Sequence, residues 1–211
     1  MNQDPMPTEE TLAPAKSPKK GNELASTLFD VLEMFAWSVF VVMILFTFVI
    51  RLCRVDGSSM NDTLQNGENL LVYSLGYTPK QDDVIVFHIT NSQSNPPMEK
   101  TMVKRVIATA GQKVKIDLET KEITVDGKVY ADSHAVFKNT YNGAYDPFLF
   151  GHGYDPVSKT FSVTVPEGHI FAMGDNRNNS MDSRNADIGF VDERCILGKV
   201  IVRVSPFTVF P

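Results

Sequence analysis

The sequence of 211 residues has little cysteine and no excess of positive charge. Cys53 and Cys195 are its only cysteines, and neither belongs to a Cys-x-x-Cys pair or a Cys/His cluster, so the chain lacks the usual ligands of a zinc site. Two unpaired thiols are expected, with a disulfide as the alternative. The net charge of -5 and the pI near 5.4 argue against nucleic-acid binding. We therefore expect no metal, no cofactor and no nucleic acid.

Beyond residue 54 the sequence also lacks any long amphipathic pattern of period 3.6. Short apolar runs alternate with Gly, Asn, Asp and Pro, which is typical of β-strands. Strands without intervening helices predict an antiparallel all-β domain. The expected strands are 69–73, 83–89, 101–108, 113–118, 161–165, 170–173 and 196–204, with a hairpin over 122–130 that turns at Asp126-Gly127.

Charge is absent from the seventeen residues between Met34 and Ile50. Apolar residues before Met34 extend this run, and a bilayer span needs about 20 such residues. A buried core helix and a cleaved signal peptide are the alternatives. The run is longer than a typical signal-peptide core, and Arg51-Leu-Cys-Arg54 follows it in place of a small-residue cleavage site. We therefore expect a retained transmembrane helix over 28–50.

The segment before this helix is rich in Pro, Glu, Lys, Thr and Ser. It cannot bury enough apolar surface to offset its ordering entropy, so residues 1–27 are expected to be a disordered tail. Three lysines precede the helix and two arginines follow it, which favours a cytoplasmic N-terminus. The charges counted are Lys16, Lys19, Lys20, Arg51 and Arg54.

A serine lies close behind the apolar run, in the stretch VDGSSMNDTL of residues 55–64. Ser59 is nine residues past Ile50, so an extended chain keeps it within roughly 30 Å of the end of the run. Most serines in Gly-Ser loops only form turns, and GSSM is not the G-x-S-x-G elbow of α/β-hydrolases. A nucleophilic serine needs a base, because its hydroxyl is weak at its free pKa.

Lys104 is the favoured candidate for that base. Strand alternation places it on the face that carries Met102 and Val106, and apolar surroundings lower the pKa of an amine. A neutral lysine can take the serine proton, as in the Ser-Lys variant of nucleophilic catalysis. The alternative is that Lys104 and Arg105 form a charged pair on an edge strand. A histidine base stays open, although no obvious carboxylate partner accompanies His88, His134, His152 or His169.

A third polar segment, GDNRNNSMDSR over residues 174–184, follows an expected strand. It does not fit a calcium loop, because Arg177 occupies the third position and Ser180 occupies the position that needs glycine. A plain polar loop is the alternative. Asp182 and Arg184 are two residues apart, so on an extended segment they could pair and fix the loop. Ser180 could then orient an amine.

These three segments resemble, in order, the conserved blocks of the bacterial type I signal peptidases, membrane-anchored serine proteases of the Ser-Lys class. The matching stretches are GSSMNDTL, KRVIATAGQKV and GDNRNNSMDSR, and the resemblance covers about residues 34–205. By this resemblance, Ser59 is the nucleophile and Lys104 the general base. By the same resemblance, Ser180 orients the lysine, and Asp182 and Arg184 form a structural pair. Asp175 and Arg177 support the same part of the site.

The loop around the nucleophile departs from the family pattern. The backbone N–H of Ser59 would serve the oxyanion hole, but Gly57 stands where some members add a hydroxyl. That donor is missing, or is replaced by Ser58 or water, in a loop that includes Met60. Asp62 replaces a usual proline, and Ala108, Ala110 and Gln112 also depart from the pattern. These changes concern loop rigidity and pocket shape and remove no catalytic group.

The resemblance implies an all-β fold of antiparallel sheets, in which a signal-peptidase-like catalytic core (51–118 and 165–211) carries an inserted β lobe (119–164) behind one N-terminal transmembrane helix. It implies a signal peptidase I that cleaves signal peptides from exported preproteins after a small-x-small motif, through an acyl-enzyme. Its partners would be these preproteins and the lipid bilayer. It would be a single-pass protein of the cell membrane with an extracytoplasmic catalytic domain.

Two other classes compete with this interpretation. Self-cleaving repressors share the Ser-Lys pair and a related β fold, but they would carry a helix-turn-helix in place of residues 1–50. A non-catalytic membrane-anchored assembly factor could retain the signal peptidase fold, but it would be expected to lose Ser59 or Lys104, and both are present.

Overall fold

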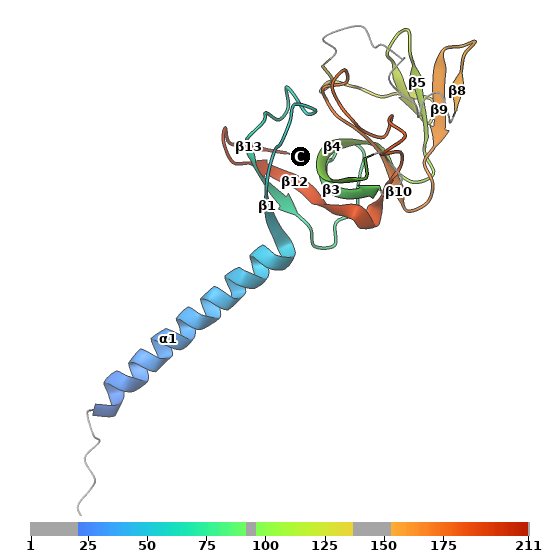
Figure 1. The fold of residues 1–211 in the computed structure, drawn as a ribbon. Helices are drawn as coiled ribbons and strands as arrows, with labels where there is room; N and C mark the ends of the chain where they lie inside the picture. Colours follow the sequence, from blue (N-terminus) through green and yellow to red (C-terminus); the bar gives the residue numbers. More distant parts are fainter. Residues whose placement is uncertain (1–20, 92–95, 137–152, 211) are drawn as a thin grey trace, which may run out of the picture. The chain divides into compact units, whose positions relative to one another are not determined.

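Two units make up the chain, and they divide between Met43 and Ile44. The computed structural model describes residues 21–91, 96–136 and 153–210 (Figure 1). The predicted tail over residues 1–20 and the middle of the predicted lobe, which includes His152, lie outside the described residues. Each unit is taken by itself below.

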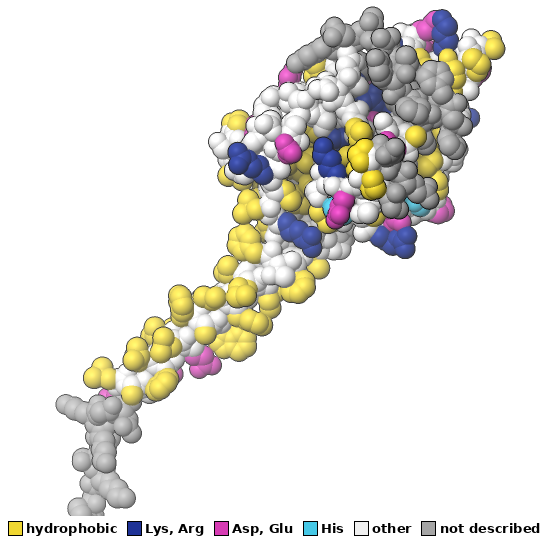
Figure 2. Space-filling model, viewed as in Figure 1, with side chains coloured by type: hydrophobic (Ala, Val, Ile, Leu, Met, Phe, Trp, Pro, Cys, Tyr) yellow, Lys and Arg dark blue, Asp and Glu magenta, His cyan; other side chains and the backbone are white. Residues whose placement is uncertain are grey.

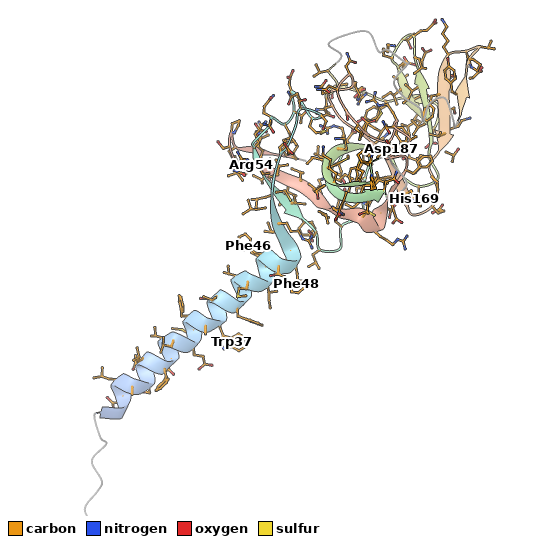
Figure 3. The ribbon with its side chains drawn as sticks, in the orientation of Figure 1. Trp37, Phe46, Phe48, Arg54, His169 and Asp187 are labelled. Atoms are coloured by element: carbon orange, nitrogen blue, oxygen red, sulfur yellow. The ribbon has the colours of Figure 1, made fainter. Side chains whose placement is uncertain are left out.

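The first unit is dominated by helix α1 (Gly21–Ile44), which continues as the π-helix η1 (Leu45–Val49) at the start of the second unit. The stretch Glu23–Val49 has 27 residues, and an 18-residue window within it has a mean hydropathy of 2.2 and no buried residue. Hydrophobic side chains surround the helix on the face shown in Figure 2, and Figure 3 shows Trp37 projecting from it. At 1.5 Å per residue these 27 residues span roughly 40 Å, which is long enough to cross a membrane.

The helix begins at Gly21, earlier than the predicted start at residue 28, so residues 21–27 of the predicted tail are helical. The hydroxyls of Ser26 and Thr27 donate hydrogen bonds to the carbonyl of Glu23, at 2.9 and 2.8 Å. These bonds satisfy the two hydroxyls within the helix, so Ser26 and Thr27 can be helical. The polar composition of residues 21–27 was therefore not a reliable sign of where the helix begins. The predicted end at Ile50 is also displaced, because Ile50 begins the first strand.

The second unit contains a larger sheet in the order β1-β2-β12-β3-β4-β10-β11, with β13 paired to β12. Every pair in it is antiparallel, which confirms the predicted antiparallel all-β class. The strands are β1 (Ile50–Arg54), β2 (Asn69–Tyr73), β3 (Val84–Asn91), β4 (Met98–Ala108), β10 (His169–Met173), β11 (Val191–Asp192), β12 (Ile196–Arg203) and β13 (Thr208–Val209). A short 3-10 helix, η3 (Glu193–Cys195), precedes β12.

Strand β3 is central because both of its faces are apolar. Its residues Val84, Ile85, Val86 and Phe87 are all buried, and β12 and β4 flank it. Alternate side chains therefore enter two clusters. One contains Val55, Met60, Leu64, Leu70, Val72, Val84, Val86 and Val200, and the other contains Ile85, Phe87, Met102, Val106, Ile170, Ala172, Ile188 and Val191.

The smaller sheet has the order β7-β6-β5-β9-β8. Its strands are β5 (Lys113–Asp117), β6 (Ile123–Val125), β7 (Lys128–Val129), β8 (Tyr154–Asp155) and β9 (Thr160–Thr164). Val114 and Phe161 of this sheet share an apolar cluster with Ile107 and Phe171 of the larger one. The smaller sheet therefore includes β5 (Lys113–Asp117). The sequence analysis assigns these residues to the catalytic core, because the predicted lobe begins only at residue 119.

The predicted hairpin is confirmed, since β6 pairs with β7 across Asp126 and Gly127. Both turn residues have positive φ, 51° and 75°, the backbone that a two-residue Asp-Gly turn requires. The strands that the sequence analysis missed are β1, β8, β11 and β13. Each lies at a sheet edge, where one-sided pairing and partial exposure leave only a weak apolar alternation.

Candidate functional site

The loop that carries Ser59 is fixed at both ends to the larger sheet. The N–H of Val55 donates to the carbonyl of Glu68 (2.8 Å), and the N–H of Gly67 donates back to Val55 (2.9 Å). Inside the loop, Met60 and Leu64 are buried in the core. The chain therefore presents Ser59 on a closed loop with apolar anchors directly after it.

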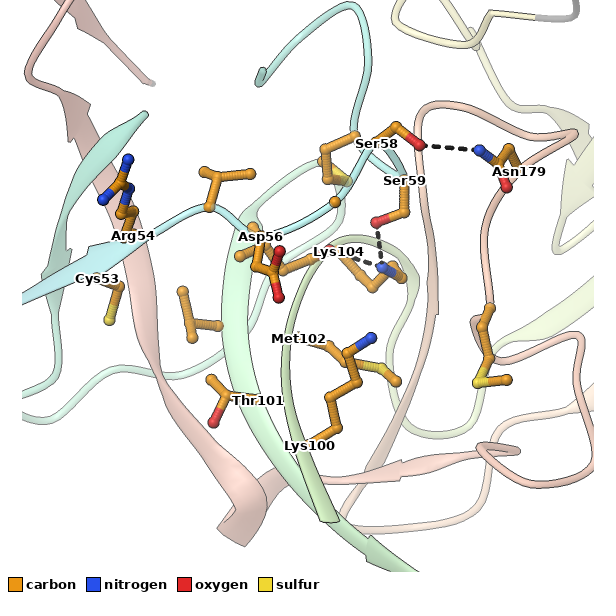
Figure 4. Close-up of a pocket in the computed structure, with 16 residues that line it drawn as sticks. Cys53, Arg54, Asp56, Ser58, Ser59, Lys100, Thr101, Met102, Lys104 and Asn179 are labelled. Carbon is orange, nitrogen blue, oxygen red and sulfur yellow. Dashed lines mark hydrogen bonds between the residues drawn. The ribbon is translucent and has the colours of Figure 1, made fainter. Parts of the chain in front are cut away.

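Lys104 meets Ser59 at hydrogen-bonding distance. Its Nζ lies 2.7 Å from Ser59 Oγ and 3.0 Å from the carbonyl oxygen of Val103 (Figure 4). Lys104 pairs with Ile85 across β3 and β4, and its neighbours Met102 and Val106 belong to one apolar cluster, as strand alternation predicts. The side chain is only 3% exposed, so it is not a surface charge.

Burial lowers the pKa of Lys104 from 10.5 to about 8, while Asp182 opposes this change. Lys100 and Arg184 lower the pKa further because they are like charges. With a pKa of about 8, roughly a tenth of the molecules carry a neutral Lys104 at pH 7. A neutral amine at 2.7 Å from a serine hydroxyl can accept its proton, which is the chemistry of a Ser-Lys hydrolase.

The predicted pair of Asp182 and Arg184 is present and buried. Arg184 Nε donates to Asp182 Oδ1 and Nη2 donates to Oδ2, both at 2.8 Å. Burial alone would raise the pKa of Asp182, but Arg184 and the N–H of Gly174 lower it overall. The carboxylate therefore stays ionised and ties the end of the 174–184 loop to its beginning.

Asp175 connects this loop to the strand of Lys104. Its carboxylate accepts two bonds from Arg105, at 2.9 and 2.7 Å, and a third from Thr63 Oγ1 at 2.6 Å. Asp175 is fully buried and the Arg105 side chain is 4% exposed. Arg105 is thus an internal clamp, and the edge-strand alternative for Lys104 and Arg105 is wrong in this structure.

Gly174 and Asn176 hold the loop against the nucleophile. A Cβ added at Gly174 would lie 2.4 Å from the carbonyl oxygen of Ser59 and 2.2 Å from Ser180 Oγ, so only glycine fits. The Asn176 N–H donates to the carbonyl of Ser59 (3.1 Å), and its Nδ2 donates to the carbonyl of Ser58 (3.0 Å). The sequence analysis did not select Gly174 or Asn176, although both lie in the block that carries the resemblance.

Ser180 lies beside Gly174, but its hydroxyl does not reach the lysine. Its Oγ is buried without a hydrogen-bond partner among the residues that the structure describes, and the hydrogen bonds of Lys104 go to Ser59 and Val103. The expected orientation of Lys104 by Ser180 therefore remains a prediction.

Arg177 has a partner that sequence reasoning missed. Its side chain is fully buried, both Nη atoms donate to the carboxylate of Asp132, and its Nε donates to the carbonyl of Gly174 (3.0 Å). The Nη2–Oδ1 distance is 2.6 Å. Asp132 is a lone acidic residue in an irregular stretch, so no local pattern could have identified it.

The oxyanion side of the loop carries two potential donors. Within the described ranges, the N–H of Ser59 makes no hydrogen bond. Ser58 Oγ accepts a bond from Asn179 Nδ2 at 2.8 Å, so its own proton is available to another acceptor (Figure 4). Gly57, with φ of 95°, donates its N–H to Asn66 Oδ1 (2.9 Å). The sequence did not single out Asn179.

A cavity of about 450 Å³ opens beside the Ser59–Lys104 pair. Its walls combine apolar side chains, among them Val86 and Val103, with the charged side chains of Asp56 and Lys100. Figure 4 shows Asp56, Lys100 and Met102 among the residues that line it. Residues 53–60 form one wall and residues 100–104 the other, with Asn179 and Met181 at the loop side. The cavity is large enough for several residues of an extended peptide.

The described histidines lie away from this pair. His88 contacts Thr101 (3.1 Å) and Glu99 (3.5 Å), and His169 contacts the carbonyl of Glu167 (2.9 Å). His134 is exposed. None of these histidine contacts involves Ser59, so a histidine base has no support in the described part of the chain.

Thiol and metal chemistry likewise have no assembled site here. Cys53 and Cys195 are both free thiols. Among the residues that the structure describes, no group of three or more His, Cys, Asp or Glu side chains could hold a metal ion.

The comparisons with known proteins agree with this chemistry. The family described as "Signal peptidase, peptidase S26" matches residues 28–205. A "Signal peptidase I" of Leptolyngbya laminosa is 30% identical over 207 residues, which cover 96% of this chain and 90% of that protein. A "Signal peptidase IB" of Staphylococcus aureus is 31% identical over 188 residues, which cover 84% of this chain and 93% of that protein. The chain therefore belongs to the signal peptidase family, peptidase S26.

One solved structure is similar in part. A signal peptidase I of Enterococcus faecalis aligns with 59% of this chain and 97% of its own length, at 21% identity and a TM-score of 0.39.

Proposed function

We propose that the protein is a membrane-anchored signal peptidase I, a serine endopeptidase that removes N-terminal signal peptides from exported preproteins. The observation that carries the proposal is the 2.7 Å contact between Ser59 Oγ and the buried Nζ of Lys104. Family membership supports the same reaction class. The sequence pattern also favours cleavage after a small-x-small motif, as the resemblance implies.

In the proposed reaction, neutral Lys104 takes the proton of Ser59 Oγ as this oxygen attacks the scissile carbonyl. The tetrahedral oxyanion accepts a hydrogen bond from the N–H of Ser59, with Ser58 Oγ as the second candidate donor. The ammonium of Lys104 then protonates the leaving amine, which leaves an acyl-enzyme. Water, deprotonated by Lys104, hydrolyses the ester and restores Ser59.

The edge of β4 next to the cavity supports substrate binding as an added strand. Residues 98–105 of β4 pair with β3 on one side, whereas β10 pairs on the other side only from Arg105 to Ala108. Among the residues that the structure describes, no strand pairs with that second edge of β4 from 98 to 104, and residues 100–104 line the cavity. An extended signal-peptide segment could hydrogen-bond there and bring its carbonyl to Ser59.

The proposal places the protein in the cell membrane as a single-pass protein with the lipid bilayer as a partner. The apolar helix supports the anchor. The three lysines before it and two arginines after it favour a cytoplasmic N-terminus and an extracytoplasmic catalytic domain. Ser59 lies only nine positions past Ile50, and this short tether suits a substrate whose cleavage site emerges at the membrane surface.

The same proposal divides the chain into a catalytic core and an inserted lobe. The core consists of residues 51–118 and 165–211, and the lobe of residues 119–164. In these terms Ser59, Lys104 and the 174–184 loop belong to the core. The alternative of a non-catalytic assembly factor is not favoured, because the chain belongs to a peptidase family and retains both members of the pair.

The test is the processing of a preprotein with a small-x-small site by detergent-solubilised enzyme. Wild type should cut after the -1 residue, and Ser59→Ala and Lys104→Ala should each lose nearly all activity. Normal rates for Lys104→Ala beside an inactive Ser59→Ala would place the base elsewhere. An inactive wild type, tested on several preproteins, would favour the assembly factor.

A further inference from the structure

The stretch from Tyr130 to Val136 joins the lobe to the catalytic loop. It follows β7, and we call these seven residues the strap. The strap forms no strand of either sheet, yet it makes polar contacts at three positions, one with Asp82 just before β3 and two with the 174–184 loop. The strap is therefore held near both of its ends and at Asp132 between them.

The first contact is at Tyr130. Its ring is buried in the apolar cluster shared by the two sheets, and its hydroxyl donates to Asp82 Oδ1. The carbonyl of Asp82 accepts a bond from Arg105 Nη1 at 2.9 Å. Arg105 is the neighbour of Lys104 on β4, so this end of the strap is tied to the strand that carries the base.

The second and third contacts are with the catalytic loop itself. The carboxylate of Asp132 receives both Nη groups of the fully buried Arg177, with Nη2 at 2.6 Å from Oδ1. The N–H of Val136 donates to the carbonyl of Asp175 (2.8 Å). The Asp132 side chain is 17% exposed, so little solvent competes for Arg177.

A short path leads from Asp132 to the nucleophile. Arg177 Nε holds the carbonyl of Gly174 (3.0 Å), and Gly174 lies so close to the carbonyl of Ser59 that a Cβ would not fit between them. On the other side, Arg184 Nη2 holds the carbonyl of Arg177 (2.9 Å). The position of Arg177 therefore fixes the face of the loop that packs on Ser59.

We propose that Asp132 is a positioning residue, through which the lobe holds the 174–184 loop against Ser59 and Lys104. This proposal rests on the proposed function, and it gives the inserted lobe a role in the reaction without any contact with substrate. It goes beyond an ordinary stabilising ion pair, because it requires that the loop, and with it the surroundings of Lys104, change when the pair is broken. Asn179 and Met181 of this loop line the same cavity as Lys104.

The kinetic test compares full-length wild type with Asp132→Ala, Asp132→Asn and the control Asp155→Ala. Asp155 lies in the same lobe, and within the described ranges its carboxylate accepts hydrogen bonds from its own turn alone, at Val157 and Ser158. We expect Asp132→Ala to lower kcat by about 10- to 100-fold, because small displacements of catalytic groups have effects of this size. KM should change less than about twofold, since the strap does not line the cavity.

The pH profile separates positioning from general damage. If the loop loosens, water reaches Lys104, and the midpoint of the kcat/KM profile should rise from about 8 toward 10.5. Asp132→Asn should lie between wild type and Asp132→Ala, because its amide oxygen still accepts one bond. Asp155→Ala should match wild type in kcat, in KM and in the midpoint of the pH profile. A folded Asp132→Ala with wild-type kcat, or with a lower kcat and an unmoved midpoint, would overturn the proposal.

Hydrogen exchange tests the strap without reference to catalysis. In the Ser59→Ala background, adding Asp132→Asn should speed exchange at the protected amides of Gly174 and Ser183 by about tenfold or more, while the strands of the smaller sheet keep wild-type exchange. Unchanged exchange in the loop would refute the proposal even if all variants process preproteins. If wild type processes no preprotein, the proposed function fails. The exchange result still decides whether Asp132 holds the 174–184 loop in place.

Discussion

Replacing Lys104 by methionine should change the pH dependence of stability in a way that measures the burial of the amine. Methionine fills a similar volume and carries no charge. The folded protein must hold Lys104 at 3% exposure, where its pKa is about 8, whereas an unfolded chain has the ordinary value of 10.5. The folded-state pKa is the lower one, so between these values the unfolded state binds more protons.

The sign of the effect follows from this difference. Stability rises with pH through the window from about 8 to 10.5, and below it the folded state bears the full cost of burying the amine. That cost is about 3 kcal/mol at pH 7 and about 1 kcal/mol at pH 10. Lys104→Met removes it, but also removes two hydrogen bonds, to Ser59 and Val103, worth about 1 kcal/mol each at any pH.

The assay is denaturant unfolding of both full-length proteins in the same detergent at pH 7 and pH 10. The pH-independent hydrogen-bond contribution cancels when the two conditions are subtracted. We expect the free energy of unfolding of Lys104→Met, relative to wild type, to fall by about 2 kcal/mol from pH 7 to pH 10. A relative stability that stays constant within about 0.5 kcal/mol would refute the claim that Lys104 is buried with a low pKa.

Three further predictions concern activity. The kcat/KM of wild type should rise with pH to a half-maximal value near pH 8 as Lys104 loses its proton, and a midpoint above pH 10 would contradict the low pKa. Gly174→Ala should reduce processing by about 100-fold or more, because its Cβ would displace the carbonyl of Ser59, and near-normal kinetics would show that the loop yields. Ser58→Ala should lower kcat by about 100-fold if its hydroxyl is the second oxyanion donor, whereas an unchanged kcat would assign that donor to water.

Local patterns sufficed for the features that depend on residues near each other in sequence. The central strands either alternate apolar and polar residues or are wholly apolar, so this pattern and their composition identified them. Lys104 stood out because a charged side chain shared a face with Met102 and Val106, and the structure buries it there. Asp182 and Arg184 are two residues apart, a spacing at which an extended chain brings them together.

Features that depend on distant residues could not be found in this way. Asp132 and Arg177 are 45 residues apart and belong to different parts of the fold, so their pairing is a tertiary event. Asn179 reaches Ser58 across 121 residues. The start of helix α1 was missed for a different reason, since Ser26 and Thr27 satisfy their hydroxyls within the helix and look like tail residues in composition.

The thiol of Cys53 offers a chemical handle inside the cavity. Cys53 belongs to the same wall as Ser59, formed by residues 53–60, and burial raises the pKa of its thiol, so alkylation at neutral pH should be slow. Cys195 is exposed and can be replaced by serine without touching that wall. A peptide that carries a disulfide-forming group could then be tethered at Cys53 in a Ser59→Ala background. Cross-linking yield as a function of the peptide position that carries the group would map the direction in which a substrate runs along β4.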